Sequence, residues 1–160
     1  MRRKQTVMSE KEIAETIPNR VLIDADVFIS YLTSDKLSGH AERLVDKADA
    51  TQVRLYAASE MYDDVITALR TERVNLATVI QVLMDIRKIP HETLPTTPEI
   101  AEQAMLLYSQ FGGPRRLHYF DAFHVTTAKI FELPLITSDR FVLQNSCSLG
   151  ITTIDLRRLS

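Results

Sequence analysis

Short apolar runs alternate along this chain with longer stretches of helical periodicity. Val21-Leu22-Ile23 is a continuous apolar run that ends at Asp24, which is typical of a strand buried on both faces. Four further segments are predicted to be strands, namely residues 53–57, 89–94, 133–137 and 151–154. Because Pro90 cannot donate a hydrogen bond within a sheet, we expect the segment 89–94 to lie at an edge.

Between these strands, apolar side chains recur at the spacing of helices. Thr97-Pro98 opens one such segment and Gly112-Gly113-Pro114 closes it. Residues 30–46 are also expected to be helical. The other helical stripes are Met61, Val65 and Leu69; Leu76, Val79, Leu83 and Ile86; Ile100, Ala104, Leu107, Tyr108 and Phe111; and Phe120, Phe123, Thr127 and Phe131. Strands that alternate with helices predict an α/β domain, in which a parallel sheet is covered by helices on both faces.

The first 19 residues are interpreted as an extension in front of this domain. Ser9 and Glu12 match a capping box, so a short helix is predicted over about residues 10–16. We therefore divide the chain into an N-terminal extension, 1–19, and one α/β domain, 20–160.

Composition excludes several classes of protein. The 160 residues are 45% hydrophobic and 25% charged, which is sufficient for one globular core and excludes a disordered or disulfide-stapled chain. Cys147 has no second cysteine to pair with and is interpreted as structural, so a reducing, cytoplasmic location is expected. Arg2, Arg3 and Lys4 are not followed by an apolar run, and no stretch approaches the roughly 20 apolar residues of a membrane span. We expect no membrane association.

Carboxylates fall at the ends of the predicted strands. Asp24 ends the first strand, Asp139 follows the fourth, and Asp64 lies about one turn into the helix after the second. Sites in parallel sheets form beyond the carboxyl ends of the strands, so these three acids are expected at one rim. Asp121 joins them if its own helix begins at the same rim. This acid lies on an otherwise apolar helix, which points to a functional role.

Four carboxylates in one cleft repel one another and take up protons unless a cation neutralises them. Oxygen ligands favour Mg²⁺ or Mn²⁺ over zinc. Such an ion can lower the pKa of a bound water and hold a phosphate in line for displacement. The cluster therefore predicts metal-assisted hydrolysis of a phosphodiester, with all four acids as metal ligands and catalytic residues.

Neighbouring polar residues receive supporting roles. We expect Asp26 to cap the following helix or to accept a hydrogen bond near the metal ligands. Thr137 is expected to hydrogen-bond a metal ligand or a water, and Ser138 to cap the helix that follows it. His124 is left outside the ligand set because four acids suffice, and His118 is assigned no role.

Three arginines are candidates for contact with substrate phosphates, which provide much of the affinity for nucleic acids. Arg115 and Arg116 follow the Gly-Gly-Pro turn, and Arg140 is adjacent to the acid after the fourth strand. A solvated basic loop is the alternative interpretation. The net charge of −2 neither indicates nor excludes a polyanionic substrate.

Four segments resemble, in order and spacing, the motifs of PIN-domain nucleases: residues 21–29, 59–69, 119–124 and 135–141. In the first, a strand ends in Asp24, and Asp26 follows after one small residue. In the second, we assign the acid to Asp64 because of its distance from the apolar stripe, with Asp63 and Glu60 as alternatives. The usual residue there is Glu, so Asp64 is shorter than the family pattern.

The resemblance covers roughly residues 20–156 and implies a three-layer α/β/α sandwich around a central parallel sheet. It also implies an endoribonuclease that depends on Mg²⁺ or Mn²⁺ and cleaves RNA, single-stranded or structured, by attack of water. Homodimers are frequent in this family, and many members are toxins paired with an antitoxin protein. The RNA target and the antitoxin remain open at this point.

Two alternatives from other classes compete with this interpretation. A phosphatase of the haloacid-dehalogenase type would use Asp24 as nucleophile and Ser59 to hold phosphate. Against it, Phe28 stands where Thr or Val is expected, and no hairpin is predicted within residues 30–46. The second alternative is a PIN-like module that binds RNA without cleaving it.

Overall fold

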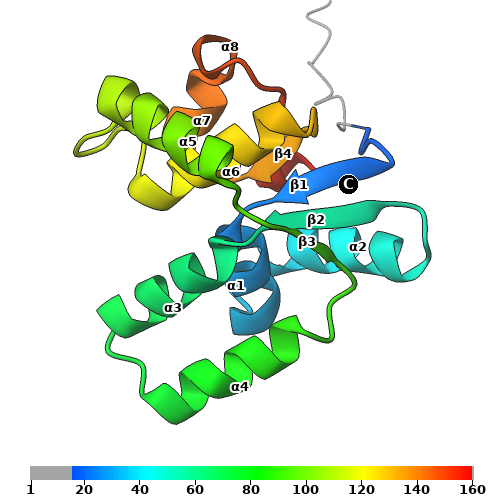
Figure 1. Cartoon of the computed structure of the whole chain (residues 1–160). Coiled ribbons are helices and arrows are strands. Elements are labelled where there is room, and N and C mark those ends of the chain that lie inside the picture. Colours follow the sequence, from blue (N-terminus) through cyan, green and yellow to red (C-terminus); the bar gives the residue numbers. More distant parts are fainter. Residues whose placement is uncertain (1–15, 160) are drawn as a thin grey trace, which may run out of the picture.

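Five strands form one parallel sheet in the order β3-β2-β1-β4-β5 in the computed structural model, which describes residues 16–159 (Figure 1). Except for Thr16, the helix expected over residues 10–16 lies outside this range. The strands are β1 (Arg20–Ile23), β2 (Arg54–Ala58), β3 (Glu92–Leu94), β4 (Leu135–Thr137) and β5 (Thr153–Asp155). Every neighbouring pair is parallel, and β3 lies at an edge as expected from Pro90.

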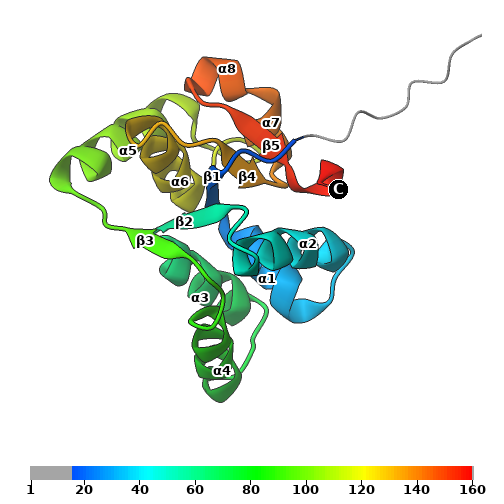
Figure 2. The same cartoon turned by 90° about the vertical axis from the view of Figure 1, so that its right-hand side faces the viewer.

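Helices cover both faces of the sheet, which confirms the three-layer α/β/α architecture. Figures 1 and 2 show α1 to α4 on one face and α5 to α8 on the other. The helices are α1 (Ala25–Thr33), α2 (Ser38–Asp49), α3 (Met61–Thr71), α4 (Leu76–Ile86), α5 (Pro98–Phe111), α6 (Tyr119–Ile130), α7 (Arg140–Gln144), α8 (Ser146–Leu149) and the 3₁₀ helix η1 (Leu156–Arg158). None of the helices in residues 16–159 is long and apolar enough to cross a membrane.

The apolar run in β1 supplies both halves of the core. Val21 and Ile23 pack with the α1 to α4 layer, while Leu22 packs with the α5 to α8 layer, because side chains of a strand alternate between the faces. All three are fully buried. A strand in the middle of the sheet therefore needs the continuous apolar pattern from which it was predicted.

The single helix expected over residues 30–46 is wrong, because α1 and α2 are separate. Ser34 adopts a left-handed conformation with φ of 53°, which ends α1. The Leu37 N–H donates to the Asp35 side chain at 2.7 Å and stabilises the turn between the helices. This local break is not visible in the apolar pattern.

Two further expectations on the far side of the sheet are corrected. Phe131 does not continue the stripe of α6, because the helix ends at Ile130 and Phe131 is 38% exposed. Cys147 is exposed on α8 and does not contribute to the core.

The strand order indicates which end of the sheet would bind a ligand. From β1 the chain moves outward through β2 to β3, then returns through α5 and α6 to β4 on the other side of β1. The carboxyl ends of β1 and β4 therefore form the switch point at which open α/β sheets bind ligands.

Candidate metal centre

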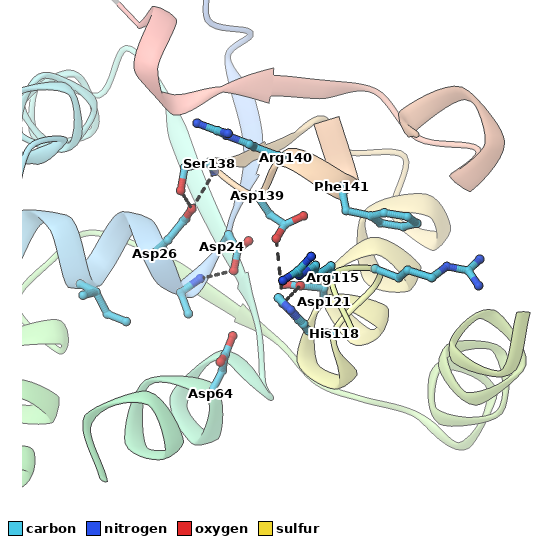
Figure 3. A pocket seen from close by; sticks show the side chains of 13 residues that line it. Asp24, Asp26, Asp64, Arg115, His118, Asp121, Ser138, Asp139, Arg140 and Phe141 are labelled. Carbon is cyan, nitrogen blue, oxygen red and sulfur yellow. Dashed lines mark hydrogen bonds and ion pairs between the residues drawn. The ribbon is translucent and has the colours of Figure 1, made fainter. Parts of the chain in front are cut away.

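Two hydrogen bonds hold the side chain of Asp24 at the end of β1. It is the N-cap of α1, and its Oδ1 accepts a hydrogen bond from the Ala25 N–H at 2.6 Å. Its Oδ2 accepts from the Thr137 hydroxyl at 2.7 Å. Both side chains are buried. The end of β1 and a side chain of the neighbouring strand β4 thus hold one carboxylate at the rim. Figure 3 shows Asp24 and its bond to the start of α1.

Asp64 on α3 is connected to Asp24 by His124, a residue outside the predicted ligand set. The Nε2 atom of His124 lies 3.0 Å from Asp64 Oδ2 and 3.5 Å from Asp24 Oδ1. His124 is fully buried on α6. The buried ring therefore contacts both carboxylates.

Asp121 lies in the first turn of α6, and this helix begins at the same rim as the strand ends. His118, directly before the helix, places Nδ1 3.1 Å from Asp121 Oδ2 and 3.9 Å from Asp139 Oδ2. Asp139 is the N-cap of α7 and accepts from the Val142 N–H at 2.8 Å. The condition set for Asp121 is met, because α6 starts next to the end of β4.

Potential ligand atoms gather in two overlapping groups, each with its atoms within 4.8 Å of one another. One group comprises Asp24, Asp64, Asp121 and His124, and the other comprises His118, Asp121 and Asp139. Asp121 belongs to both groups. The carboxylate oxygens suit Mg²⁺ or Mn²⁺, and a nitrogen in each group also suits transition metals. The residues present therefore fit a divalent metal centre.

Electrostatics in the metal-free protein favour the uptake of positive charge. Burial, followed by the nearby Asp24 carboxylate, raises the pKa of Asp121 to about 8. Burial also raises the pKa of Asp24. For His124, burial disfavours the charged ring, but the Asp24 and Asp64 carboxylates outweigh it and raise the pKa to about 9. One imidazolium against several carboxylates leaves negative charge that a divalent cation would neutralise.

We expect the metal-free protein to lose stability as the pH rises from about 6 to 9. The folded-state pKa of His124 exceeds its usual value of 6.5, so its contribution is complete below that pH and is lost as the pH rises through about 9. The raised pKa of Asp121 acts in the same direction up to about 8. Thermal unfolding in EDTA across this range measures the loss. Excess Mg²⁺ should flatten the curve, and a midpoint that rises with pH in EDTA would contradict this explanation.

Asp26 and Ser138 pair with each other and do not cap helices. The Ser138 N–H donates to Asp26 Oδ2 at 2.6 Å, and the Ser138 hydroxyl donates to the same oxygen. The caps expected from these two residues are wrong, because Asp24 and Asp139 occupy both cap positions. Burial, followed by the Asp24 carboxylate, raises the pKa of Asp26 to about 7. Asp26 thus accepts hydrogen bonds from Ser138 at the edge of the cleft that it lines, and a supporting role near a metal stays a prediction.

The three acids considered for the second motif separate clearly in space. Asp64 lies in a ligand group, whereas Asp63 is exposed. Glu60 accepts hydrogen bonds from Ser59 at 3.1 Å and from Thr96. The Ser59 hydroxyl thus donates to Glu60, and Ser59 is not one of the described residues that line the cleft. The phosphate-holding role that a phosphatase would require of Ser59 has no geometric support.

The carboxylates share their cleft with the candidate phosphate-binding residues. Arg115, Arg116 and Arg140 all line it, as do Asp24 and Phe141. Figure 3 labels Arg115 and Arg140 beside the acids. Arg115 has a left-handed backbone with φ of 60°, in the turn that leads to α6. Cations around an anionic centre suit a substrate whose backbone is negatively charged.

Two histidines at the centre were missed. His124 lies three residues after Asp121 and His118 three residues before it, and both spacings place side chains on one face of a helix or its first turn. For His124 this spacing did not indicate a ligand, because the four acids already complete the predicted set. Whether His124 reaches Asp64 depends on the distance between α3 and α6, and the sequence contains no signal for that distance.

Comparisons with known proteins identify the family and the fold of this chain. The profile of the PIN domain family matches residues 21–142. Among solved structures, VapBC2 from Rickettsia felis bound to a promoter DNA fragment gives a TM-score of 0.58 at 9% identity, covering 85% of this chain and 98% of that one. VapBC-1 from nontypeable Haemophilus influenzae gives 0.58 at 16% identity, covering 86% and 98%.

A third structure, VapBC-5 from Mycobacterium tuberculosis, gives a TM-score of 0.56 at 18% identity and covers 86% of this chain and 99% of that one. At these identities the likeness shows the fold alone. A search of curated proteins by sequence gave no match.

Proposed function

Because this chain belongs to the PIN domain family, we propose that it is an endoribonuclease that depends on Mg²⁺ or Mn²⁺. The observation that carries the proposal is the convergence of Asp24, Asp64 and Asp121 within one group of ligand atoms, and of Asp121 and Asp139 within the adjoining group. These four acids are proposed as the metal ligands and catalytic residues. Residues 20–160 are proposed as the nuclease domain.

A divalent ion held by these acids would supply Lewis-acid activation of water and of the scissile phosphate. The chain's own task is to present oxygen ligands in fixed positions. The Thr137 hydroxyl and the Ala25 N–H orient Asp24. His124 holds Asp64, and the Val142 N–H holds Asp139. Such contacts restrict the ligands to one geometry and so favour binding of the ion.

The substrate side of the cleft is proposed to hold a single-stranded RNA. Arg115, Arg116 and Arg140 line the cleft and are proposed to contact phosphates on either side of the scissile bond. Water attacks phosphorus, the bond to the 3′ oxygen breaks, and that oxygen takes up a proton. The products then carry a 5′ phosphate and a 3′ hydroxyl.

We further propose that the protein is the toxin of a toxin–antitoxin pair and forms a homodimer. This is supported by the fold it shares with VapBC-5, a member of the VapBC family of toxin-antitoxin systems. The proposed partner is therefore an antitoxin protein, which would control access to the cleft.

The direct test is cleavage of a single-stranded RNA by the purified chain in EDTA, Mg²⁺ and Mn²⁺. We expect cleavage with either ion, none in EDTA, and a 5′ phosphate at each new end. RNA binding without cleavage in every metal would instead support the non-catalytic module. A phosphoryl group trapped on Asp24 would support the phosphatase.

A further inference from the structure

Two arginines lie directly opposite each other at the amino end of the sheet, away from the metal centre. Arg20 on β1 is the register partner of Arg54 on β2. Neighbouring strands are about 4.8 Å apart, so like charges in this arrangement repel each other. No carboxylate oxygen of residues 16–159 lies within 4.0 Å of either guanidinium. The repulsion is therefore uncompensated by an ion pair in the described chain.

Tyr56, a buried tyrosine, lies next to Arg20 and Arg54. Tyr56 lies two residues after Arg54, so both project from the same face of β2. The Arg20 Cζ atom lies 5.3 Å from the centroid of the Tyr56 ring, and Tyr56 is only 5% exposed. Hydrogen bonding from Arg54, and then from Arg20, lowers the pKa of the Tyr56 hydroxyl. Both arginines therefore project from the face of the sheet that carries the Tyr56 ring.

We propose that Arg20 and Arg54, side by side next to Tyr56, form a binding site for a phosphate group. A guanidinium presents a planar fork of donors, and stacking on an aromatic ring holds that fork in place. A carboxylate has two oxygens, which one fork can occupy. Two neighbouring forks instead suit an anion with three or four oxygens and more than one negative charge, which is the chemistry of phosphate.

Both arginines are exposed and lie in a hollow with a mixed polar and apolar lining. Arg20 and Arg54 line the same hollow, together with Asn19 and Gln52. Glu92 is the one acidic residue that lines it, and it is the register partner of Tyr56. Its charge opposes anion binding, which offers an internal control.

This site is separate from the carboxylate cleft. Arg20 and Asp24 occupy opposite ends of β1, about 13 Å apart for four residues of extended chain. The residues that line the cleft do not include Arg20, Arg54 or Tyr56. The proposal therefore stands independently of nuclease activity, and its test needs neither metal nor cleavage.

The experiment measures binding of inorganic phosphate by calorimetry in EDTA. The parent carries Arg115→Gln and Arg140→Gln, which removes cations of the cleft. Arg54→Gln is expected to weaken binding about tenfold or more, since charge-assisted hydrogen bonds are lost. Without phosphate, the same change should raise the unfolding midpoint, because it relieves the repulsion with Arg20.

Three further variants make the result specific. Arg54→Lys keeps the charge but loses the fork, and should also bind more weakly. Glu92→Gln should bind more tightly than the parent. Arg87→Gln removes an exposed charge that lines neither hollow, and should bind like the parent. A parent that binds no phosphate, or equal losses in Arg54→Gln and Arg87→Gln, would overturn the proposal.

Oligonucleotides then identify the source of the phosphate. The same short strand is compared with a 5′ phosphate and with a 5′ hydroxyl. Binding of the phosphorylated strand alone, lost in Arg54→Gln, assigns a terminal phosphate. Equal binding of both, again lost in Arg54→Gln, assigns backbone phosphates. Binding of inorganic phosphate with neither strand bound assigns a free anion.

Discussion

Asp121→Asn is expected to lower RNA cleavage by more than about a hundredfold and to make the metal-free protein more stable to heat. Asp121 is the residue that belongs to both groups of ligand atoms. Loss of a residue that merely orients a metal ligand costs 10–100-fold, and loss of a ligand should cost more. Asparagine keeps the shape of the side chain but carries no charge, so it ends the repulsion with the Asp24 carboxylate.

Both halves of this prediction are measurable on one preparation. Initial cleavage rates in saturating Mn²⁺ give the loss of activity. Unfolding in EDTA at pH 9, where Asp121 is ionised, should give a midpoint a few degrees higher, since 1 kcal/mol corresponds to roughly 2–4 °C in a domain of this size. Cleavage at the wild-type rate would show that Asp121 is not part of the metal centre.

A matched pair of variants on α3 separates the metal centre from general effects of charge. Asp64→Asn removes a carboxylate of the ligand group, and Asp63→Asn removes its exposed neighbour. We expect Asp64→Asn to behave like Asp121→Asn and Asp63→Asn to behave like the wild type. Equal losses in both would indicate a long-range effect of charge on RNA binding.

His124→Leu should lower the free energy of unfolding by about 3 kcal/mol in the absence of metal, because removing one partner of a buried ion pair leaves uncompensated charge. His124 is fully buried and lies beside the carboxylates of Asp24 and Asp64. Leucine replaces the ring by an apolar side chain without a positive charge. Urea unfolding in EDTA at pH 8 measures the difference.

Two further variants test that explanation. His118→Leu removes a histidine that also contacts carboxylates but is 65% exposed, so its effect should be within about 1 kcal/mol. Asp64→Asn combined with His124→Leu should recover part of the loss, because the buried charges are removed together. Divalent ions should raise the free energy of unfolding of His124→Leu more than that of the wild type. If the single variant unfolds like the wild type, the ring does not neutralise the carboxylates.

The sequence was sufficient for those parts of the site that follow from strand ends. Asp24 and Asp139 could be placed at one rim because parallel strands end on the same side of a sheet. The placement of Asp121 required the direction of α6, and the sequence left this open. The structure shows that α6 starts beside β4, as the 3.9 Å separation of His118 from Asp139 requires.

Roles that depend on distances between separate elements could not be predicted. The link from His124 to Asp64 joins α6 to α3, which are 60 residues apart along the chain. Asp26 meets Ser138 because α1 begins only one residue after β1, so Asp24 is the cap and Asp26 lies in the first turn of the helix. Apolar periodicity reports which face of an element is buried, and it does not report which polar groups meet across the sheet.

The direct junction of β1 and α1 at Asp24 has a consequence for the way the centre is assembled. Asp24 closes the first turn of α1, and Asp139 does the same for α7, so two acids of the centre are held in position by folding itself. Preorganised ligands spare the ion the cost of ordering the chain around it. Removal of the ion by a chelator should accordingly abolish RNA cleavage without unfolding the domain. Adding the ion back should restore cleavage without a refolding step.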